Sequence, residues 1–94
     1  PGYYKPGAFG IRIENLVVVT VVDPQPPGAE RTTLGFETLS LAPYERRLID
    51  VSLLSGAERA WVDAYHRSVR EQLSPLLEPE VAEYLAAATA PLVA

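Results

Sequence analysis

The chain contains no cysteine among its 94 residues. It therefore has no disulfide framework, and thiolate metal sites of the zinc-ribbon kind are excluded. Since disulfides mark oxidising compartments, their absence fits a reducing one. We accordingly expect a cytoplasmic location.

An excess of basic residues is also missing, because the formal net charge is −4. Such a chain offers no basic footprint for nucleic acid or for an anionic membrane. No apolar run approaches the ~20 residues needed to span a bilayer. The first residues lack the basic and then apolar pattern of a signal peptide. We expect neither nucleic acid nor a membrane as a partner.

Methionine is absent as well, and the chain opens on Pro1-Gly2. The simplest interpretation is a piece of a longer polypeptide. A chain of this length buries only about 60–65% of its unfolded surface, so its stability alone would be marginal. Hydrophobic residues make up 48% of it, which indicates a folded segment rather than a disordered tail.

Two β-rich runs follow a Gly, Pro and Tyr-rich start. Residues 11–22 are mostly β-branched and apolar, and residues 34–42 form a second such run that ends before Pro43. A loop rich in proline and charge, residues 23–33, separates them. This arrangement predicts two strands paired as an antiparallel hairpin.

Two helices are predicted after the strands. Ser55 and Glu58 match a capping box, which starts a helix over residues 56–73. An apolar stripe recurs along it every four residues, at Trp61, Tyr65, Val69 and Leu73. Pro79 suits the first turn of a second helix, over residues 79–89. The predicted fold class is α+β, with one domain over residues 1–94.

Glu14 is the residue that stands out chemically, because a carboxylate lies within a strand of Ile, Leu and Val. Burying an unpaired carboxylate is costly, so it should be paired or bound to metal. Arg12 lies on the same face, about 6.6 Å along an extended strand. From these residues alone, an ion pair at an exposed strand end is the more common outcome, and metal ligation is the alternative.

Three blocks of sequence carry a family resemblance: Pro-Gly-Tyr-Tyr at 1–4, Gly-Ile-Arg-Ile-Glu-Asn at 10–15 and Phe-Glu-Thr-Leu-Ser-Leu-Ala-Pro at 36–43. It continues through Leu-Ile-Asp at 48–50 and Trp-Val-Asp-Ala-Tyr-His at 61–66. Together they resemble the end of Xaa-Pro aminopeptidases, metallopeptidases of the pita-bread fold. The chain is thus similar to the C-terminal part of such a catalytic domain.

The resemblance implies a dinuclear centre, usually of manganese, held by two Asp, one His and two Glu. One of these glutamates maps onto Glu14, and the other would lie directly before Pro1. Arg12 is implied to stand beside the site without binding metal. The implied substrates are peptides with proline in second position. Since one expected ligand of five is present, the chain alone should be inactive and should need the remainder of the catalytic domain. The oligomeric state stays open, a homodimer included.

Two alternatives remain for the parent protein. One is a prolidase-like enzyme of the same fold, and the other is a non-catalytic pita-bread relative that only binds a partner. Small departures from the family pattern occur at Ser40, Tyr44 and Asp63, none of them in the metal motif.

Other polar candidates have simpler interpretations. Glu37 is expected to be a structural partner for an upstream residue, with a place beside the metal ligands as the alternative. His66 is expected to be a packed structural residue with one ring nitrogen bonded. The run from Glu45 to Arg47 is expected to be a solvated turn.

Overall fold

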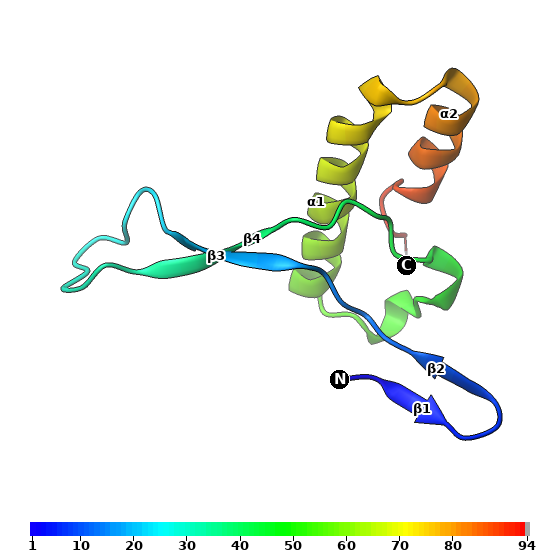
Figure 1. Cartoon of the computed structure of the whole chain (residues 1–94), viewed down its shortest axis with the longest axis horizontal. Coiled ribbons are helices and arrows are strands. Elements are labelled where there is room, and N and C mark those ends of the chain that lie inside the picture. Colours follow the sequence, from blue (N-terminus) through cyan, green and yellow to red (C-terminus); the bar gives the residue numbers. More distant parts are fainter. Residues whose placement is uncertain (94) are drawn as a thin grey trace. The chain divides into compact units, whose positions relative to one another are not determined.

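The computed structural model describes residues 1–93, which form two compact units, Pro1–Ser40 and the part from Leu41 onward. Figure 1 shows strands in the first unit and helices in the second. Each unit is described by itself. No helix among the described residues is long and apolar enough to cross a membrane.

The first unit contains two antiparallel hairpins. In one, β1 (Tyr3–Lys5) pairs with β2 (Phe9–Ile11), with Tyr3 opposite Ile11. Its turn contains Gly7 at a φ of 72°, a conformation that glycine adopts without steric cost. In the other, β3 (Val17–Val21) pairs with β4 (Leu34–Thr38), with Val19 opposite Phe36. The hairpin predicted across the Pro-rich loop is therefore confirmed.

The expectation of one continuous strand over residues 11–22 is wrong. Ile11 ends β2, and residues 12–16 belong to no strand. The cause is a change of partner, because Ile11 pairs with β1 whereas Val17 pairs with β4. The predicted strand over residues 34–42 is also shorter, ending at Thr38. Beyond it, the Ser40 hydroxyl accepts a hydrogen bond from the Leu16 amide at 2.7 Å, in place of a backbone carbonyl.

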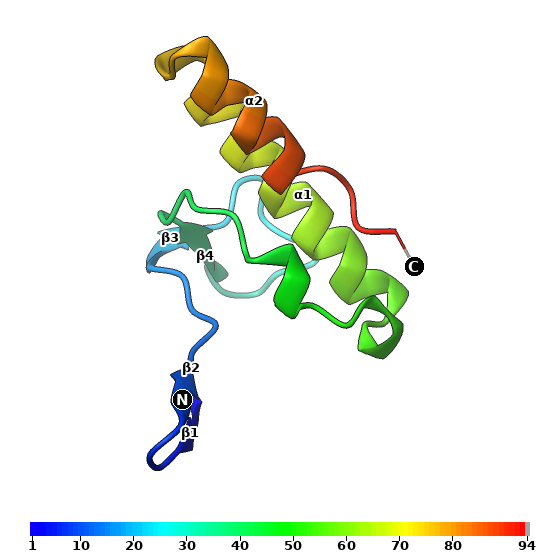
Figure 2. The ribbon, with the colours of Figure 1, turned by 90° about the vertical axis from the view of Figure 1, so that its right-hand side faces the viewer.

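The second unit is a helical hairpin preceded by two 3₁₀ turns, η1 (Arg46–Leu48) and η2 (Val51–Leu53). The helices are α1 (Gly56–Leu73) and α2 (Pro79–Ala88), joined by the 3₁₀ turn η3 (Ser74–Leu76). Figures 1 and 2 show α2 running back along α1. The predicted capping box is present, since the Ser55 hydroxyl accepts from the Glu58 amide and the Glu58 carboxylate accepts from the Ser55 amide. Helix α2 ends one residue earlier than predicted.

The core lies between these two helices. Tyr65, Val69 and Leu85 are its buried apolar side chains, and Leu41, Tyr44, Leu73 and Leu77 pack around them. The predicted stripe thus faces the core over most of its length. Trp61 is the exception, because it is 52% exposed and stacks on the Tyr65 ring at 5.6 Å.

Two adjacent residues of α1 hold the segment that precedes η1. The Tyr65 hydroxyl donates to the Ala42 carbonyl at 2.8 Å and accepts from the Ala42 amide at 3.2 Å. His66 Nε2 accepts from the Tyr44 amide at 2.9 Å. His66 is completely buried, so the prediction of a packed histidine with one bonded nitrogen is confirmed. We call these contacts the Tyr65–His66 clasp.

The clasp requires a neutral imidazole. Because Nε2 accepts a hydrogen bond, the ring proton is on Nδ1, which has no hydrogen-bond partner among the described residues. Burial holds the pKa of His66 below its ordinary value of 6.5. Positive charge on Arg46 and Arg70 acts in the same direction, and Asp63 opposes it.

The folded state should therefore lose stability as the pH falls below about 6.5, where the unfolded chain binds a proton that buried His66 does not. One such proton sets an upper limit of about 1.4 kcal/mol per pH unit on the slope. Chemical denaturation between pH 7 and pH 5, followed by helical circular dichroism, measures this slope. His66→Gln supplies an acceptor that does not titrate, so it should flatten the dependence. An equal slope in this variant would contradict the assignment to His66.

Candidate functional site

Arg12 and Glu14 form an ion pair in the segment between β2 and β3. Arg12 Nη2 lies 3.3 Å from Glu14 Oε2, and both side chains are 57% exposed. An exposed pair of this kind contributes roughly 0–1 kcal/mol to stability. Stability therefore gives little reason for placing a carboxylate at this point of an apolar sequence.

The start of the chain lies against the same segment. A Cβ atom added to Gly2 would be 2.8 Å from the Ile11 carbonyl oxygen and 2.9 Å from Arg12 Cγ. Real side chains do not approach this closely, so the Arg12 stem can pass Gly2 only because glycine has no Cβ. In the sequence, Gly2 is marked only by its place in the opening Pro-Gly-Tyr-Tyr block. Its packing role could not have been found without the register of the first hairpin.

The described residues do not assemble a complete metal site. Among residues 1–93, no group of three or more His, Cys, Asp or Glu side chains is placed to hold an ion. Glu14 has the hard oxygen donors that Mn²⁺, Mg²⁺ and Ca²⁺ prefer. Its carboxylate thus has the chemistry of one such ligand, and the described residues do not complete a site around it.

The remaining sequence candidates do not join Glu14 in a cluster. Glu37 lies in β4 directly opposite Val18 and is exposed. His66 belongs to the core of the helical unit, where its Nε2 is already engaged by the Tyr44 amide. Neither residue belongs to a group of candidate metal ligands among the described residues.

The charged run from Glu45 to Arg47 is more structured than the predicted solvated turn. Glu45 caps η1 by accepting from the Arg47 amide at 3.1 Å and from Arg47 Nε at 3.0 Å. These hydrogen bonds lower the pKa of Glu45 to about 2. Arg46 donates to the carbonyl oxygens of Ala90 and Pro91, so it ties η1 to the tail after α2. The expectation of a simple solvated turn is therefore wrong for Arg46, whose tail contacts are long-range and leave no local sequence signal.

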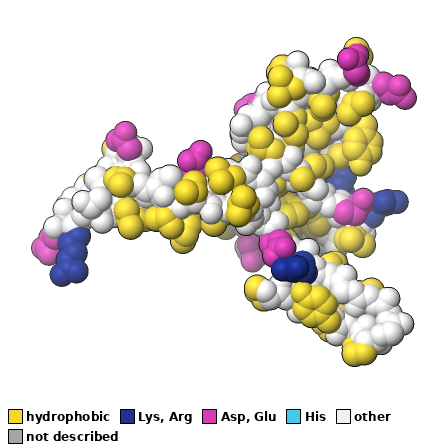
Figure 3. All heavy atoms as spheres, viewed as in Figure 1, with side chains coloured by type: hydrophobic (Ala, Val, Ile, Leu, Met, Phe, Trp, Pro, Cys, Tyr) yellow, Lys and Arg dark blue, Asp and Glu magenta, His cyan; other side chains and the backbone are white. Residues whose placement is uncertain are grey.

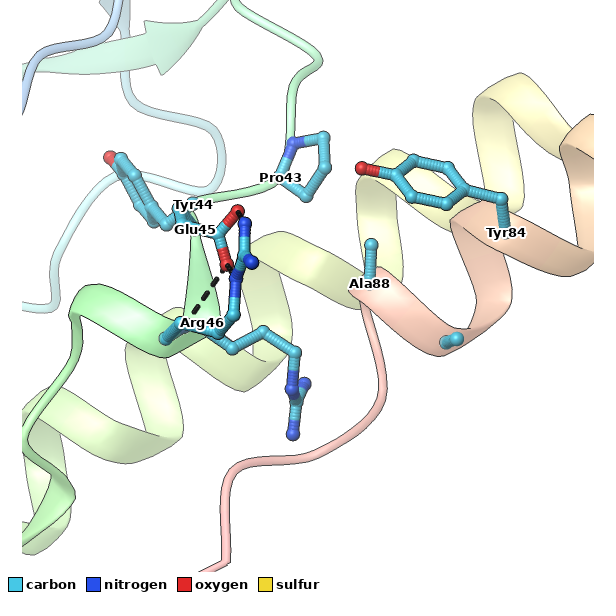
Figure 4. Close-up of a pocket in the computed structure, with 8 residues that line it drawn as sticks. Pro43, Tyr44, Glu45, Arg46, Tyr84 and Ala88 are labelled. Atoms are coloured by element: carbon cyan, nitrogen blue, oxygen red, sulfur yellow. Dashed lines mark hydrogen bonds and ion pairs between the residues drawn. The ribbon is translucent and has the colours of Figure 1, made fainter.

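A shallow hollow of about 460 Å³ lies beside this run (Figure 4). It is lined by Pro43, Tyr44, Glu45, Arg46, Arg47, Tyr84, Ala87 and Ala88. The Glu45 carboxylate accepts hydrogen bonds from the Arg47 side chain, and Arg46 donates to the Pro91 carbonyl in the tail after α2. The charged side chains of the hollow are thus engaged in hydrogen bonds within the protein. The described residues that line it form no arrangement suited to catalysis.

Comparison with known proteins places the chain in a family. Residues 32–92 match the sequence model described as the C-terminal region of peptidase M24. That match covers β4 and the helical unit as far as residue 92, and it does not include Arg12 or Glu14.

Longer proteins match a larger part of the chain. A protein of Arthroderma benhamiae named "Probable Xaa-Pro aminopeptidase P" is 46% identical over 80 residues, which cover 85% of this chain and 12% of that protein. One of Coprinopsis cinerea with the same name is 42% identical over 94 residues, which cover 98% of this chain and 15% of that protein.

A solved structure of a related enzyme also matches the chain. The X-prolyl aminopeptidase of Caenorhabditis elegans, described as a cytosolic enzyme with a di-nuclear active site, superposes with a TM-score of 0.85 at 29% identity. The superposition covers 98% of this chain and 15% of that enzyme, so the α+β arrangement is that of a fragment of a pita-bread aminopeptidase domain. The chain spans only 12–15% of the length of these relatives. The chain belongs to the peptidase M24 family, whose C-terminal region it matches, and its relatives include proteins named Xaa-Pro aminopeptidase P.

Proposed function

We propose that this chain is the C-terminal segment of a metal-dependent Xaa-Pro aminopeptidase, and that it contributes Glu14 as a metal ligand. The observation that carries the proposal is the position of Glu14. It is paired with Arg12 in a segment against which the start of the chain packs through Gly2. The substrates would be peptides with proline in second position, and the enzyme would be cytoplasmic.

The register of the first hairpin indicates which residue would lie opposite Glu14. Tyr3 pairs with Ile11 and Tyr4 pairs with Gly10. Each step forward along β2 is therefore matched by one step back along β1. Continued in the same register, Gly2 stands opposite Arg12, and a residue before Pro1 would stand opposite Glu14. Directly opposite residues have Cβ atoms about 4.5–5.5 Å apart. A glutamate at that preceding position, as the family pattern implies, would bring two carboxylates together.

Two carboxylates at this separation suit a pair of divalent ions. Hard ions take oxygen ligands, and sites with two ions about 3.5–4 Å apart use carboxylates to hold them. Manganese is the ion we propose. When bound, the ions would supply Lewis-acid assistance to amide hydrolysis. The chain's own part is to hold the Glu14 oxygens in position.

Arg12 has a separate role in this proposal. Its guanidinium donates to Glu14 Oε2, which leaves the second carboxylate oxygen for another contact. A hydrogen-bonding partner of this kind orients a ligand without binding the metal. The stem of Arg12 lies beside Gly2, so the pairing of the first hairpin contributes to the position of the guanidinium.

The isolated 94-residue chain should have no Xaa-Pro aminopeptidase activity and only weak affinity for Mn²⁺. Tight sites use several protein ligands, and the described residues bring no three candidate ligands together. Isothermal titration with Mn²⁺ and an assay on an Xaa-Pro peptide check both statements. Clear turnover by the purified chain would refute the proposal that it is only a segment of the enzyme.

The role of Glu14 can be tested in a chimera in which these 94 residues replace the matching C-terminal segment of the Coprinopsis cinerea relative. Glu14→Gln and Glu14→Ala should lower peptide cleavage by more than about 100-fold, the upper range for residues that only support a ligand. Metal content should fall with activity. Arg12→Ala should reduce cleavage by about 10–100-fold while metal stays bound.

The ion-pair alternative predicts another pattern for the same variants. Arg12→Ala and Glu14→Ala would then behave alike, each costing roughly 0–1 kcal/mol of stability with activity near normal. Full metal occupancy and near-normal cleavage in Glu14→Ala would end the ligand assignment. An inactive but folded and metal-free parent chimera would instead favour a non-catalytic relative.

Gly2→Ala in the same chimera tests the packing that positions Arg12. The added Cβ meets backbone and the Arg12 stem, so we expect a destabilisation of about 1–3 kcal/mol, as for other overpacked sites, together with lower activity. Gly56→Ala is the matched control, because a Cβ there has nothing within 4 Å. Thermal unfolding and peptide cleavage are the measurements. Equal behaviour of the two variants would show that Gly2 does not constrain the site.

A further inference from the structure

Residues 89–92, which follow α2 and which we call the strap, are held against the rest of the helical unit by charged side chains. Arg70 Nη1 donates to the Thr89 carbonyl at 2.8 Å and to the Thr89 hydroxyl at 3.1 Å. Arg46 donates to the next two carbonyl oxygens of the strap. Hydrogen bonds with a charged donor are roughly twice as strong as those between neutral groups. Two arginines from different elements thus hold the first part of the strap.

The far end of the strap is held by a carboxylate and by packing. The Asp63 carboxylate of α1 accepts from the Leu92 amide at 2.8 Å. The Leu92 side chain is only 6% exposed, and Thr89 at the other end is 1% exposed. The strap is therefore attached to η1 and α1 along its whole length.

The three charged side chains that hold the strap also surround His66. Asp63 and Arg70 lie three residues before and four residues after His66 on α1, spacings that place side chains on one face of a helix. Arg46 acts on the same ring from η1. The ring is completely buried, and no histidine side chain is visible on the face shown in Figure 3. A positive charge on His66 would therefore act on the groups that hold the strap.

A short segment of backbone connects His66 to the strap. At its start, the Tyr44 amide donates to His66 Nε2 at 2.9 Å. Two residues further on, Arg46 donates to the strap. The rings of Tyr44 and Tyr65 lie beside the imidazole, with centroids 6.0 and 5.9 Å away. A proton on Nε2 would set two N–H donors against each other and would detach Tyr44 from α1.

We propose that protonation of His66 releases Tyr44 and, through Arg46, the strap, so that the helical unit contains a pH-sensitive switch. In the closed state, burial and the positive charges of Arg46 and Arg70 disfavour a charged ring. Asp63 favours the charge, but its carboxylate is already bonded to the strap. In the released state the ring reaches water, which solvates the imidazolium. The switch lies within the helical unit and does not depend on a metal site.

Release should become more favourable as the pH falls. The pKa of His66 lies below its ordinary value of 6.5 in the closed state and returns toward that value on release. The released state therefore binds a proton that the closed state does not. With a pKa of 6.5 after release, one proton raises the ratio of released to closed molecules by up to about eightfold between pH 7 and pH 5.5.

Amide hydrogen exchange of the 94-residue chain, followed by NMR, measures release. The Tyr44 amide reports on the Tyr65–His66 clasp, the Leu92 amide on the strap and the Val69 amide on the core. Protection factors are corrected for the intrinsic exchange rate at each pH. Those of Tyr44 and Leu92 should lie at least about tenfold below that of Val69, because they open without unfolding of the unit. They should fall together by about three- to eightfold between pH 7 and pH 5.5.

Three variants separate the steps of the switch. His66→Gln supplies an acceptor that does not titrate, so protection of Tyr44 and Leu92 should no longer depend on pH. Arg46→Gln cuts the link to the strap, so Leu92 should be weakly protected at every pH while Tyr44 keeps its pH dependence. Arg67→Gln removes the same charge from an exposed position next to His66 and is the matched control, in which both amides should behave as in the unmodified chain.

Several outcomes would overturn the switch. Equal protection of Tyr44, Leu92 and Val69 would mean that the strap leaves only when the unit unfolds. An unchanged pH dependence in His66→Gln would remove His66 as the sensor, and a Leu92 amide that still follows pH in Arg46→Gln would remove Arg46 as the link. Where His66→Gln does not fold, the unmodified chain and Arg46→Gln give the decision.

The Coprinopsis cinerea chimera extends the test to a longer chain. Hydrogen exchange measured by mass spectrometry on peptides over the strap should show the same fall in protection between pH 7 and pH 5.5. Peptides from α1 that cover Val69 should remain more strongly protected. A strap whose corrected exchange does not change with pH in a folded chimera would overturn the proposal for the longer protein.

Discussion

The constraint behind the first unit is that a two-stranded ribbon cannot bury both of its faces. Strands rich in Val, Ile and Leu gain stability only when those side chains leave water, at about 1.5–3 kcal/mol for a fully buried one. In Pro1–Ser40 none does so, whereas the helical unit has its own small core at Tyr65, Val69 and Leu85. Among the described residues, the hairpins therefore have no hydrophobic core of their own.

In the helical unit, two neighbouring side chains of α1 bind the segment that precedes η1. Tyr65 and His66 both hydrogen-bond to the backbone of Ala42–Tyr44, through the Ala42 amide and carbonyl and the Tyr44 amide. The arrangement leaves His66 Nδ1 without a partner among the described residues. The His66 ring lies beside those of Tyr44 and Tyr65, with ring centroids 6.0 and 5.9 Å away.

Local signals in the sequence determined much of the architecture. The capping box at Ser55 and Glu58 and the proline at 79 set the helix starts, because these residues act on backbone groups within one turn. Strand propensity and the Pro-rich loop between them determined the β3–β4 hairpin. Glu14 and Arg12 could be singled out because charge is conspicuous in an apolar stretch of sequence, and the family blocks around them gave those residues a proposed chemistry.

Only the tertiary structure decided where those elements stop and what they touch. Alternation along residues 11–22 looks the same whether a strand keeps one partner or changes it, so the break after Ile11 is invisible in the sequence. The approach of Gly2 to Arg12 depends on the register with which two segments pair. The bonds from Arg46 to Ala90 and Pro91 cross more than forty residues of chain. Contacts between distant residues leave no local pattern, because each partner alone is compatible with many surroundings.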